Sequence, residues 1–310
     1  MKGFILRKVL LLVPLLFGIT LTTFALTKAL PGDPAVNMVG ERSRPEIIAK
    51  MRKEIGADKG VVRQYAGYVL LLLQGEMGRS YYTNRNVLDD IRIKFPNTLR
   101  LALGAMAMAI PPGMILGLFA AMRKGGWADR TISVFSISLL SIPVFWSGLM
   151  LMLLFGLVLK LLPPSGTGGL RYMLLPALTL SLPALGTIAR VTRVSVLEVA
   201  DMPFIRTARA KGISDCRVNG IHVMKNALIP VVTVIGLDFA SYLNGAVLTE
   251  TIFGWDGIGR FMMEGIIKRD YPVIMGCIIV GTSLFVFTNL AVDILYHYLD
   301  PRMRIYETER

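Results

Sequence analysis

The sequence contains few of the residues that build disulfide-bonded or metal-binding proteins. Its 310 residues include two cysteines and two histidines, and only 18% of the residues are charged. Cys216 lies in a polar segment and Cys277 in an apolar one, so a disulfide framework is not supported. His222 and His297 lie far apart, without cysteines or carboxylates at ligand spacing, which argues against a metal site.

Motifs for phosphate binding and catalysis are also missing. The sequence has no Gly-x-x-x-x-Gly-Lys-Ser/Thr loop, and the glycine-rich stretch 254–259 lacks the following lysine and a strand-to-helix context. We therefore interpret this stretch as a tight turn rather than a nucleotide site. No pairing of a nucleophile with a base and no pair of carboxylates suggests catalysis. The chain is expected not to be an enzyme and to bind no cofactor itself.

What the sequence has in abundance is apolar residues in long blocks. Hydrophobic residues make up 54% of the chain, and the mean hydropathy is +0.58. Blocks of roughly 20 apolar residues are long enough to cross the hydrocarbon core of a bilayer as helices. The first block resembles a signal peptide but is longer than a cleavable apolar region, so it is expected to be retained. The predicted spans cover approximately residues 9–30, 98–122, 131–161, 172–194, 228–249 and 272–296.

The positive charge of the chain fits a membrane protein better than a nucleic-acid-binding one. The formal net charge is +13, and the cations cluster beside the apolar blocks rather than forming a basic stripe with interleaved aromatics. In the tails and short loops, Lys and Arg gather on the N-terminal side of the membrane. The sequence therefore predicts a multi-pass protein of the cell (inner) membrane with both termini in the cytoplasm, and no nucleic-acid partner.

Two regions are expected along the chain. Residues 1–97 combine an N-terminal anchor with a polar extracytoplasmic segment, which has amphipathic stretches near 47–55 and 65–73. Residues 98–310 form the core transmembrane domain. Within its first span, Gly113 and Gly117 have the small-x-x-x-small spacing that favours close helix packing. Pro143 is expected to kink the third span.

The cytoplasmic loop at about 198–227 carries a short, bounded helix. Asp201 is predicted to cap it, Pro203 to occupy its first turn, and Gly212 to end it. An apolar side and surrounding cations are expected, formed respectively by Phe204, Ile205 and Ala208 and by Arg206, Arg209 and Lys211. Such a short helix needs packing to be stable, which favours a docking partner. The alternative is that the cations only enforce topology and contact anionic lipid.

Several ordered motifs across nearly the whole chain carry a resemblance. They are Leu30-Pro31-Gly32-Asp33-Pro34, Gly75-Glu76-Met77-Gly78-Arg79-Ser80, Pro96-Asn97-Thr98-Leu99, the segment from Phe204 to Gly212, His222, Asn226-Ala227-Leu228, Glu250-Thr251-Ile252-Phe253, Arg269-Asp270-Tyr271-Pro272 and Asp300-Pro301-Arg302. In order and spacing they resemble the permease subunits of ATP-binding-cassette importers, specifically the B-type subunit of dipeptide, oligopeptide and nickel systems.

This resemblance implies an all-α polytopic bundle of about six transmembrane helices with the type I importer permease fold. It implies that the short cytoplasmic helix couples to separate ATPase subunits, which bind ATP and Mg. The coupling residues are then Phe204, Arg206, Thr207, Ala208, Arg209, Ala210, Lys211 and Gly212. Arg206 stands where the general loop pattern has Glu, and Met224-Lys225 where it has Leu-Pro. The implied partners are a C-type permease subunit, two ATPase subunits and an extracytoplasmic solute-binding protein.

The fifth predicted span carries three polar residues, Asp238, Ser241 and Asn244, at spacings that place them on one helical face. Polar groups inside a membrane should face protein or water. Asp238 is expected either to line the solute path or to make a structural hydrogen bond between helices. The outer segments 31–97 and 250–271 are expected to contact the binding protein or simply to cover the bundle.

Two other classes of protein remain as alternatives. An ion-coupled secondary transporter would show inverted repeats and coupling carboxylates at the membrane midplane, and neither is evident. A membrane receptor or scaffold would need no pathway, and it would not bind ATPase subunits. The imported solute is expected to be a peptide, with nickel or another small solute as the alternative.

Overall fold

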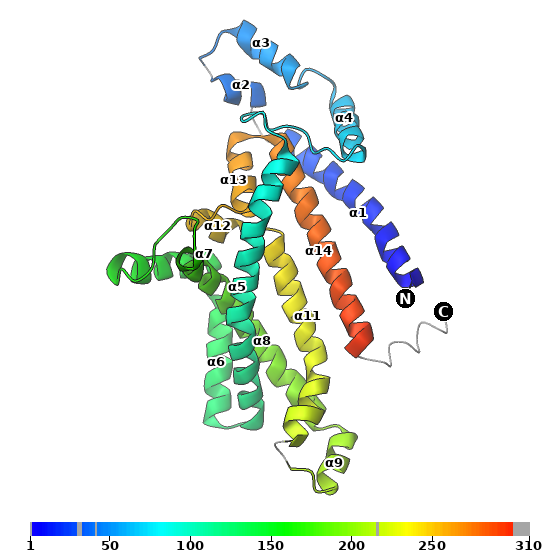
Figure 1. The fold of residues 1–310 in the computed structure, drawn as a ribbon, viewed down its shortest axis with the longest axis vertical. Helices are drawn as coiled ribbons and strands as arrows, with labels where there is room; N and C mark the ends of the chain where they lie inside the picture. Colours follow the sequence, from blue (N-terminus) through cyan, green and yellow to red (C-terminus); the bar gives the residue numbers. More distant parts are fainter. Residues whose placement is uncertain (1, 30–32, 41, 215–216, 300–310) are drawn as a thin grey trace. The chain divides into compact units, whose positions relative to one another are not determined.

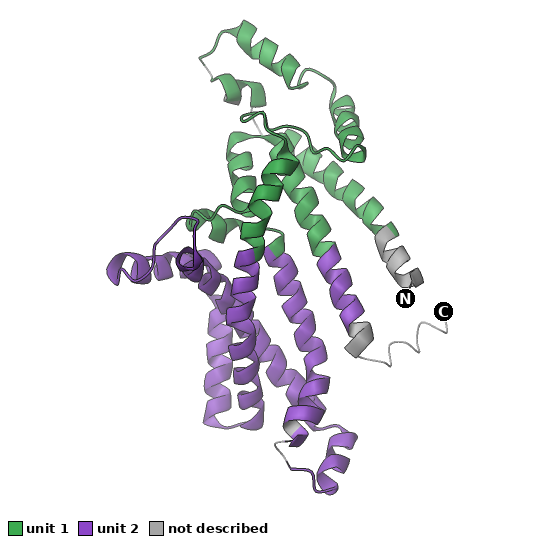
Figure 2. Ribbon diagram, viewed as in Figure 1, with its two compact units in different colours: residues 1–99, 243–286 green, residues 100–242, 287–310 purple. Residues whose placement is uncertain are grey.

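The computed structural model of the protein describes residues 2–29, 33–40, 42–214 and 217–299, and helices dominate it (Figure 1). The chain divides into two compact units (Figure 2). Unit 1 comprises residues 1–99 and 243–286, and unit 2 comprises residues 100–242 and 287–310. Two long helices, α5 (Val87–Met122) and α14 (Tyr271–Leu299), have residues in both units.

The remaining helices belong to one unit each. Unit 1 contains α1 (Lys2–Ala29), α2 (Pro34–Val39), α3 (Pro45–Glu54), α4 (Val61–Leu73), α12 (Val247–Ile252) and α13 (Ile258–Lys268). Unit 2 contains α6 (Trp127–Ser141), α7 (Val144–Leu151), the π-helix η1 (Met152–Val158), α8 (Leu170–Ala200), α9 (Pro203–Ala210), the π-helix η2 (Val218–Val223) and, except for its last residue, α11 (Met224–Leu243).

Five helices are long and apolar enough to cross a membrane, and six if one bent pair is counted as a span. The five stretches are Leu10–Lys28, Val87–Met122, Leu170–Ala200, Gly220–Leu243 and Tyr271–Leu295. Each overlaps a span predicted from hydropathy; residue 30, the predicted end of the first span, lies outside the described residues. The predicted third span is the bent pair.

The third span turns far more sharply than the kink expected at Pro143. Trp127–Ser141 and Val144–Val158 meet at an angle of 96°. Pro143 lies in extended backbone between the two helices, because it has no N–H with which to continue the ladder of α6. The helix that follows then changes from α to π geometry at Met152.

Close packing of α5 against α8 forms much of the core of unit 2. A Cβ atom added to Gly113 would lie 2.9 Å from Cγ2 of Ile188, and one added to Gly117 would lie 2.6 Å from Cβ of Thr192. These contacts confirm the close-packing role predicted for the two glycines. Buried residues of α5, α8 and α11 continue the contact and include Met106, Ala184, Ile188 and Val231.

Helix α6 packs along α8 in unit 2. In its first turn, Asp129 is buried and forms an ion pair with Arg193, whose Nη2 donates to Asp129 Oδ2 at 2.9 Å. The same carboxylate oxygen accepts from the backbone N–H of Gly125. The beginning of α6 therefore lies beside the carboxyl-terminal part of α8.

Unit 1 has its own apolar core, in which α5, α13 and α14 meet through Val87, Ile91, Ile258, Val273 and Cys277. Helices α3 and α4 cover the two amphipathic stretches predicted in the polar segment. On α4, the hydroxyl of Tyr65 lies 3.0 Å from Oγ1 of Thr20 on α1. The Tyr65 ring also packs against Phe17 and Phe24, so α4 is attached to the first span.

Candidate functional site

Helix α9 is the short helix that the sequence predicts within residues 198–227, but it begins differently. Pro203 occupies the first turn, as expected. Asp201 does not cap it: Asp201 has right-handed helical backbone angles and ends α8, whereas Met202 precedes α9 in extended backbone without a side-chain cap. The predicted cap is therefore wrong, because α8 continues up to the residue that was expected to start the next helix.

The carboxyl end of α9 agrees with the prediction. Gly212 has a positive φ of 78°, and its N–H donates to the carbonyl of Arg209 at 2.9 Å. This left-handed conformation is typical of the residue that follows a helix, and it favours glycine. No atom of the described residues lies within 4 Å of a Cβ added to Gly212, so within this part of the chain the requirement for glycine is conformational rather than steric.

The apolar residues of α9 do not share one side, contrary to the prediction. Ile205 is fully buried in a cluster with Val196 of α8, Val218 and Val223 of η2, and Ala227 of α11. Ala208 packs against the same cluster, while Phe204 keeps 44% of its surface exposed. The inner side of α9 is therefore fixed to the chain's own helices, and Phe204 is left on the outside.

The outer side of α9 combines this aromatic ring with exposed cationic and small polar side chains. Arg206, Arg209 and Lys211 are exposed, as are Thr207 and Ala210. The Thr207 hydroxyl donates to the carbonyl of Pro203. An exposed aromatic residue surrounded by arginines has the composition typical of an interface centre, so this surface is suited to bind another protein.

The three polar residues predicted on the fifth span occupy two kinds of environment. Asp238 lies on α11 and is half-buried; among the described residues its Oδ2 atom has no hydrogen-bond partner. Ser241 is exposed on the same helix, and Asn244 is exposed one residue beyond the helix end. The structural hydrogen bond considered for Asp238 Oδ2 is therefore not formed within the part of the chain that the structure describes.

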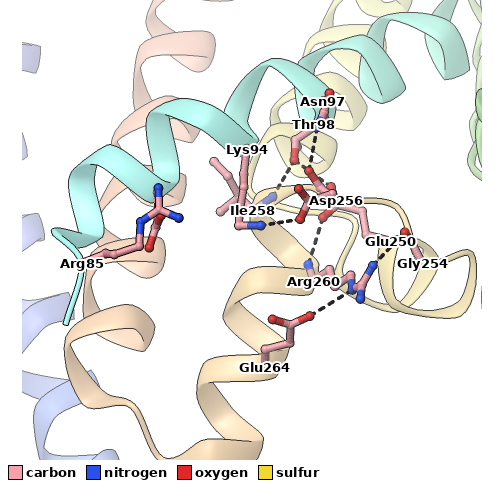
Figure 3. A network of polar contacts seen from close by, with 11 residues as sticks. Arg85, Lys94, Asn97, Thr98, Glu250, Gly254, Asp256, Ile258, Arg260 and Glu264 are labelled. Carbon is pink, nitrogen blue, oxygen red and sulfur yellow. Dashed lines mark hydrogen bonds and ion pairs between the residues drawn. The ribbon is translucent and has the colours of Figure 1, made fainter. Parts of the chain in front are cut away.

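A second polar site, in unit 1, surrounds the side chain of Glu250 (Figure 3). Glu250 on α12 is fully buried. Thr98 Oγ1 donates to Glu250 Oε1 at 2.8 Å, and the N–H of Arg260 donates to Oε2 at 3.0 Å. Thr98 Oγ1 also accepts from the N–H of Ile258 at 2.9 Å. The carboxylate thus joins α5 to the turn that begins α13.

Further contacts fix the same turn to α5 (Figure 3). Lys94 forms an ion pair with Asp256, whose carbonyl accepts from Asn97 Nδ2 at 2.8 Å. Indole Nε1 of the buried Trp255 donates to the Asn97 carbonyl at 3.0 Å. On the other side, Arg260 donates to the Gly254 carbonyl and pairs with Glu264. The turn is therefore fixed to α5 by Lys94, Asn97 and Thr98.

The close approach of α12 explains two glycines of this stretch, Gly257 and Gly259. A Cβ atom added to Gly257 would lie 2.5 Å from the Glu250 carboxylate, and one added to Gly259 would lie 3.0 Å from Glu250 Oε2 and 2.8 Å from Cα of Val247. Burial raises the pKa of the Glu250 carboxyl, while hydrogen bonds from the Arg260 N–H and the Thr98 hydroxyl act in the opposite direction. Residues 254–257 thus turn around a carboxylate, in agreement with the prediction, while residues 258 and 259 already belong to α13.

Asp270 joins two motifs that lie far apart in the sequence. This buried residue precedes α14 and accepts from Ser80 Oγ at 2.5 Å and from the N–H of Tyr81 at 3.2 Å. Burial raises the pKa of the Asp270 carboxyl, although the hydrogen bonds from Ser80 and Tyr81 lower it. The motif that ends at Ser80 and the motif 269–272 thus contact each other directly.

Sequence reasoning singled out these motifs but not the contacts between them. Thr98 and Glu250 are separated by 152 positions, and no periodicity connects them. Residues 30–32 and 300–302, which carry parts of two motifs, lie outside the described residues, as does Cys216. Among the described residues, no three His, Cys, Asp or Glu side chains are grouped to hold a metal ion.

Comparisons with known proteins cover the chain from end to end. The model of the family described as "Binding-protein-dependent transport system inner membrane component" matches residues 113–305, and the model of its N-terminal region matches residues 1–102. The di/tripeptide transport system permease protein DppB of Pseudomonas aeruginosa (strain UCBPP-PA14) is 41% identical over 98% of this chain and 99% of its own. The dipeptide transport system permease protein DppB of Escherichia coli (strain K12) is 38% identical over the same shares.

Solved structures agree on the fold. Two inward-facing crystal forms of the MetNI methionine ABC transporter match 68% of this chain and 96% of their own, with TM-scores of 0.58 and 0.59. At 16% identity the likeness shows the fold alone. It confirms the predicted class of an all-helical, multi-span membrane protein with the architecture of an importer permease.

Proposed function

Because the chain belongs to the family of binding-protein-dependent transport system inner membrane components, we propose that it is the permease subunit of an ATP-driven importer of dipeptides and tripeptides. Membership makes it a multi-pass inner-membrane transport component rather than an enzyme, working with ATPase and binding-protein partners. The observation that carries the peptide assignment is the end-to-end match to two permeases named for peptide transport.

The proposed assembly has this chain and a homologous C-type permease subunit in the membrane, two ATPase subunits that bind ATP and Mg in the cytoplasm, and an extracytoplasmic binding protein. Helix α9 docks on an ATPase subunit through its outer side, with Phe204 at the centre and Arg206 and Arg209 around it. Burial of Ile205 supports this role, because its cluster connects α9 to four other helical elements of unit 2, namely α5, α8, η2 and α11. Closure of the ATPases on ATP then moves these elements together with α9.

The proposed orientation has six crossings with both termini in the cytoplasm. The bent pair α6–α7 supports the count despite its 96° bend. Asp129 at the start of α6 pairs with Arg193 near the carboxyl end of α8, and the chain then continues to Leu170 at the amino end of α8. Since α8 is a candidate span, these positions support one net crossing by the segment from 127 to 169.

Asp238, Ser241 and Asn244 remain a proposal for part of the solute path. Two observations support it: Asp238 Oδ2 has no hydrogen-bond partner in the described part of the chain, and Ser241 is exposed. A polar group inside a membrane needs protein or water around it. In the assembled importer the second permease subunit would complete the path along this helix. The segments 31–97 and 250–271 are proposed to face the binding protein.

The test is uptake of a radiolabelled dipeptide, such as dialanine, by cells in which this gene is deleted and then restored. We expect uptake to disappear on deletion and to return with the gene, and affinity purification of the tagged chain to bring down two ATPase polypeptides and a second permease. Unchanged dipeptide uptake in the deletion strain, together with purification of the chain without ATPase polypeptides, would refute the proposal.

A further inference from the structure

Unit 1 contains a cavity of about 640 Å³ between α1, α3, α4, the loop at 77–84 and the beginning of α14. Cavities of this size are typical of small-ligand sites. Apolar side chains form part of its wall, among them Met38, Met51, Leu71 and Met275. It is distinct from α9, from the α11 polar residues and from the Glu250 network.

The charged groups of the cavity are predominantly cationic. Lys28, Lys59, Arg63 and Arg79 line it, and Glu54 supplies the one carboxylate that the described residues place on its wall. Glu54 is itself 3.9 Å from Lys50. Among the described residues, no carboxylate lies within ion-pair distance of Lys59 or Arg63. The wall therefore carries an excess of positive charge that would attract an anion.

One buried hydrogen-bonding group on the wall is also unsatisfied. The hydroxyl of Tyr68 is inaccessible to water and, within the described part of the chain, has no hydrogen-bond partner. A buried hydroxyl without a partner is costly, so native structures usually provide one. Because the Tyr68 side chain lines the cavity, a small movement of its ring on ligand binding would let an anionic oxygen accept this O–H.

The position of the cavity relative to the spans indicates the source of that anion. Lys28 is the last residue of the candidate span Leu10–Lys28, and Tyr271 is the first of the candidate span Tyr271–Leu295. Both line the cavity, and the Lys28 ammonium lies 5.0 Å from the centre of the Tyr271 ring. Ends of spans lie at the level of the lipid headgroups, where cationic and aromatic side chains commonly meet them.

We propose that this cavity binds an acidic phospholipid, with the headgroup phosphate among the lysine and arginine side chains and the apolar wall in contact with the glycerol and acyl region. Net negative charge favours an acidic headgroup over a zwitterionic one, because the phosphate charge is not cancelled within the ligand. The lipid would hold α1, α4 and α14 together at one membrane surface.

The experiment measures thermal unfolding of the purified full-length chain in detergent with added phosphatidylglycerol or phosphatidylcholine. We expect phosphatidylglycerol to stabilise the chain more strongly. The double substitution Lys59→Gln/Arg63→Gln should weaken its apparent affinity roughly tenfold or more, since each cation near an anionic lipid surface contributes appreciably. Arg44→Gln/Lys53→Gln is the matched control, with the same charge change in the same segment but outside the cavity wall, and it should retain the affinity.

A second variant separates binding from folding. Tyr68→Phe should leave the lipid-free protein as stable as the wild type or more so, because it removes an unpartnered buried hydroxyl. It should nevertheless reduce stabilisation by phosphatidylglycerol. Equal stabilisation by the two lipids, equal losses in the double variant and its control, or displacement of phosphatidylglycerol by dialanine would overturn the proposal. Loss of dipeptide uptake is not the readout, so this test is independent of the proposed transport function.

Discussion

At the scale of single residues, Thr98 occupies a position that few side chains could fill. Its hydroxyl is buried, donates to Glu250 and accepts from the N–H of Ile258. Among the described residues, no other side chain in the network of Figure 3 donates to Glu250 Oε1 or accepts from the Ile258 N–H. Threonine therefore supplies a hydrogen bond on each side. Valine of the same shape would remove the acceptor of the Ile258 N–H and one donor to the Glu250 carboxylate, which would keep the bond from the Arg260 N–H.

We predict that Thr98→Val lowers the free energy of unfolding by ~1–3 kcal/mol, the typical cost of an unsatisfied buried polar group. The control is Thr251→Val, whose hydroxyl is exposed and bonds only to the Val247 carbonyl in its own helix. Thermal unfolding in detergent measures both. Equal effects of the two substitutions would contradict the role assigned to Thr98.

The loss of unfolding free energy in Thr98→Val should depend on pH, and the direction of this dependence follows from the Glu250 pKa. Burial raises the Glu250 pKa, and the Thr98 hydroxyl opposes that rise, so its removal raises the folded-state pKa further. A higher folded-state pKa means tighter proton binding in the folded variant than in the folded wild type. The deficit of Thr98→Val should therefore be complete above the raised pKa and shrink as the pH falls through it.

Residue-scale contacts of this kind were the part least accessible from sequence. The glycines near 257 were correctly predicted to form a turn, since glycine clusters mark turns. Their real constraint, the carboxylate of Glu250, comes from tertiary packing that joins positions far apart in the chain. The cap predicted at Asp201 failed for a related reason, because α8 extends further than its apolar pattern indicated.

At the scale of elements, hydropathy predicted the spans well because lipid imposes a simple requirement of length and apolarity. Hydropathy does not show where a helix extends beyond its apolar part. The span was predicted to begin at residue 98, whereas α5 begins eleven residues earlier, at Val87, with Asp89 and Asp90 in its first turn. The sequence likewise did not predict which apolar residues of α9 are buried. Contacts with neighbouring helices bury Ile205 and leave Phe204 exposed.

This difference in burial determines which substitution in α9 tests coupling to the ATPase. Ala208 packs against the buried cluster, so a bulky residue there would disturb the chain's own packing. Phe204 is exposed, and its removal should leave the fold intact. We predict that Phe204→Ala keeps the protein in the membrane but weakens ATPase binding by ~2 kcal/mol or more, near thirtyfold, as expected for an aromatic interface centre.

Co-purification of ATPase polypeptides and dipeptide uptake, both normalised to permease in the membrane, measure the effect. Phe135→Ala is the matched control, because Phe135 on α6 has a similar exposure of 47% and lies outside α9. Wild-type uptake and ATPase retention in Phe204→Ala would show that α9 does not dock through this side. A loss shared equally with Phe135→Ala would have the same consequence.

At the scale of the whole molecule, the direction in which α9 faces depends on the number of crossings that precede it. If the bent pair makes one net crossing, α9 lies on the same side as the N-terminus, where an ATPase can reach it. If the pair returns to the side from which it came, α9 lies on the opposite side, and coupling to a cytoplasmic ATPase is impossible. The ion pair between Asp129 and Arg193 favours the first arrangement.

Cysteine labelling in intact cells distinguishes the two arrangements. In a Cys216→Ser/Cys277→Ala background, single cysteines at Ser165, between η1 and α8, and at Lys211, after α9, are decisive, because both positions are exposed and the two arrangements exchange their sides. We predict that a membrane-impermeant maleimide labels position 165 and not position 211, while permeabilised cells are labelled at both. Labelling of 211 but not of 165 would place α9 outside. The pair α6–α7 would then be a re-entrant loop, and the helix proposed to receive the ATPase would be separated from it by the membrane.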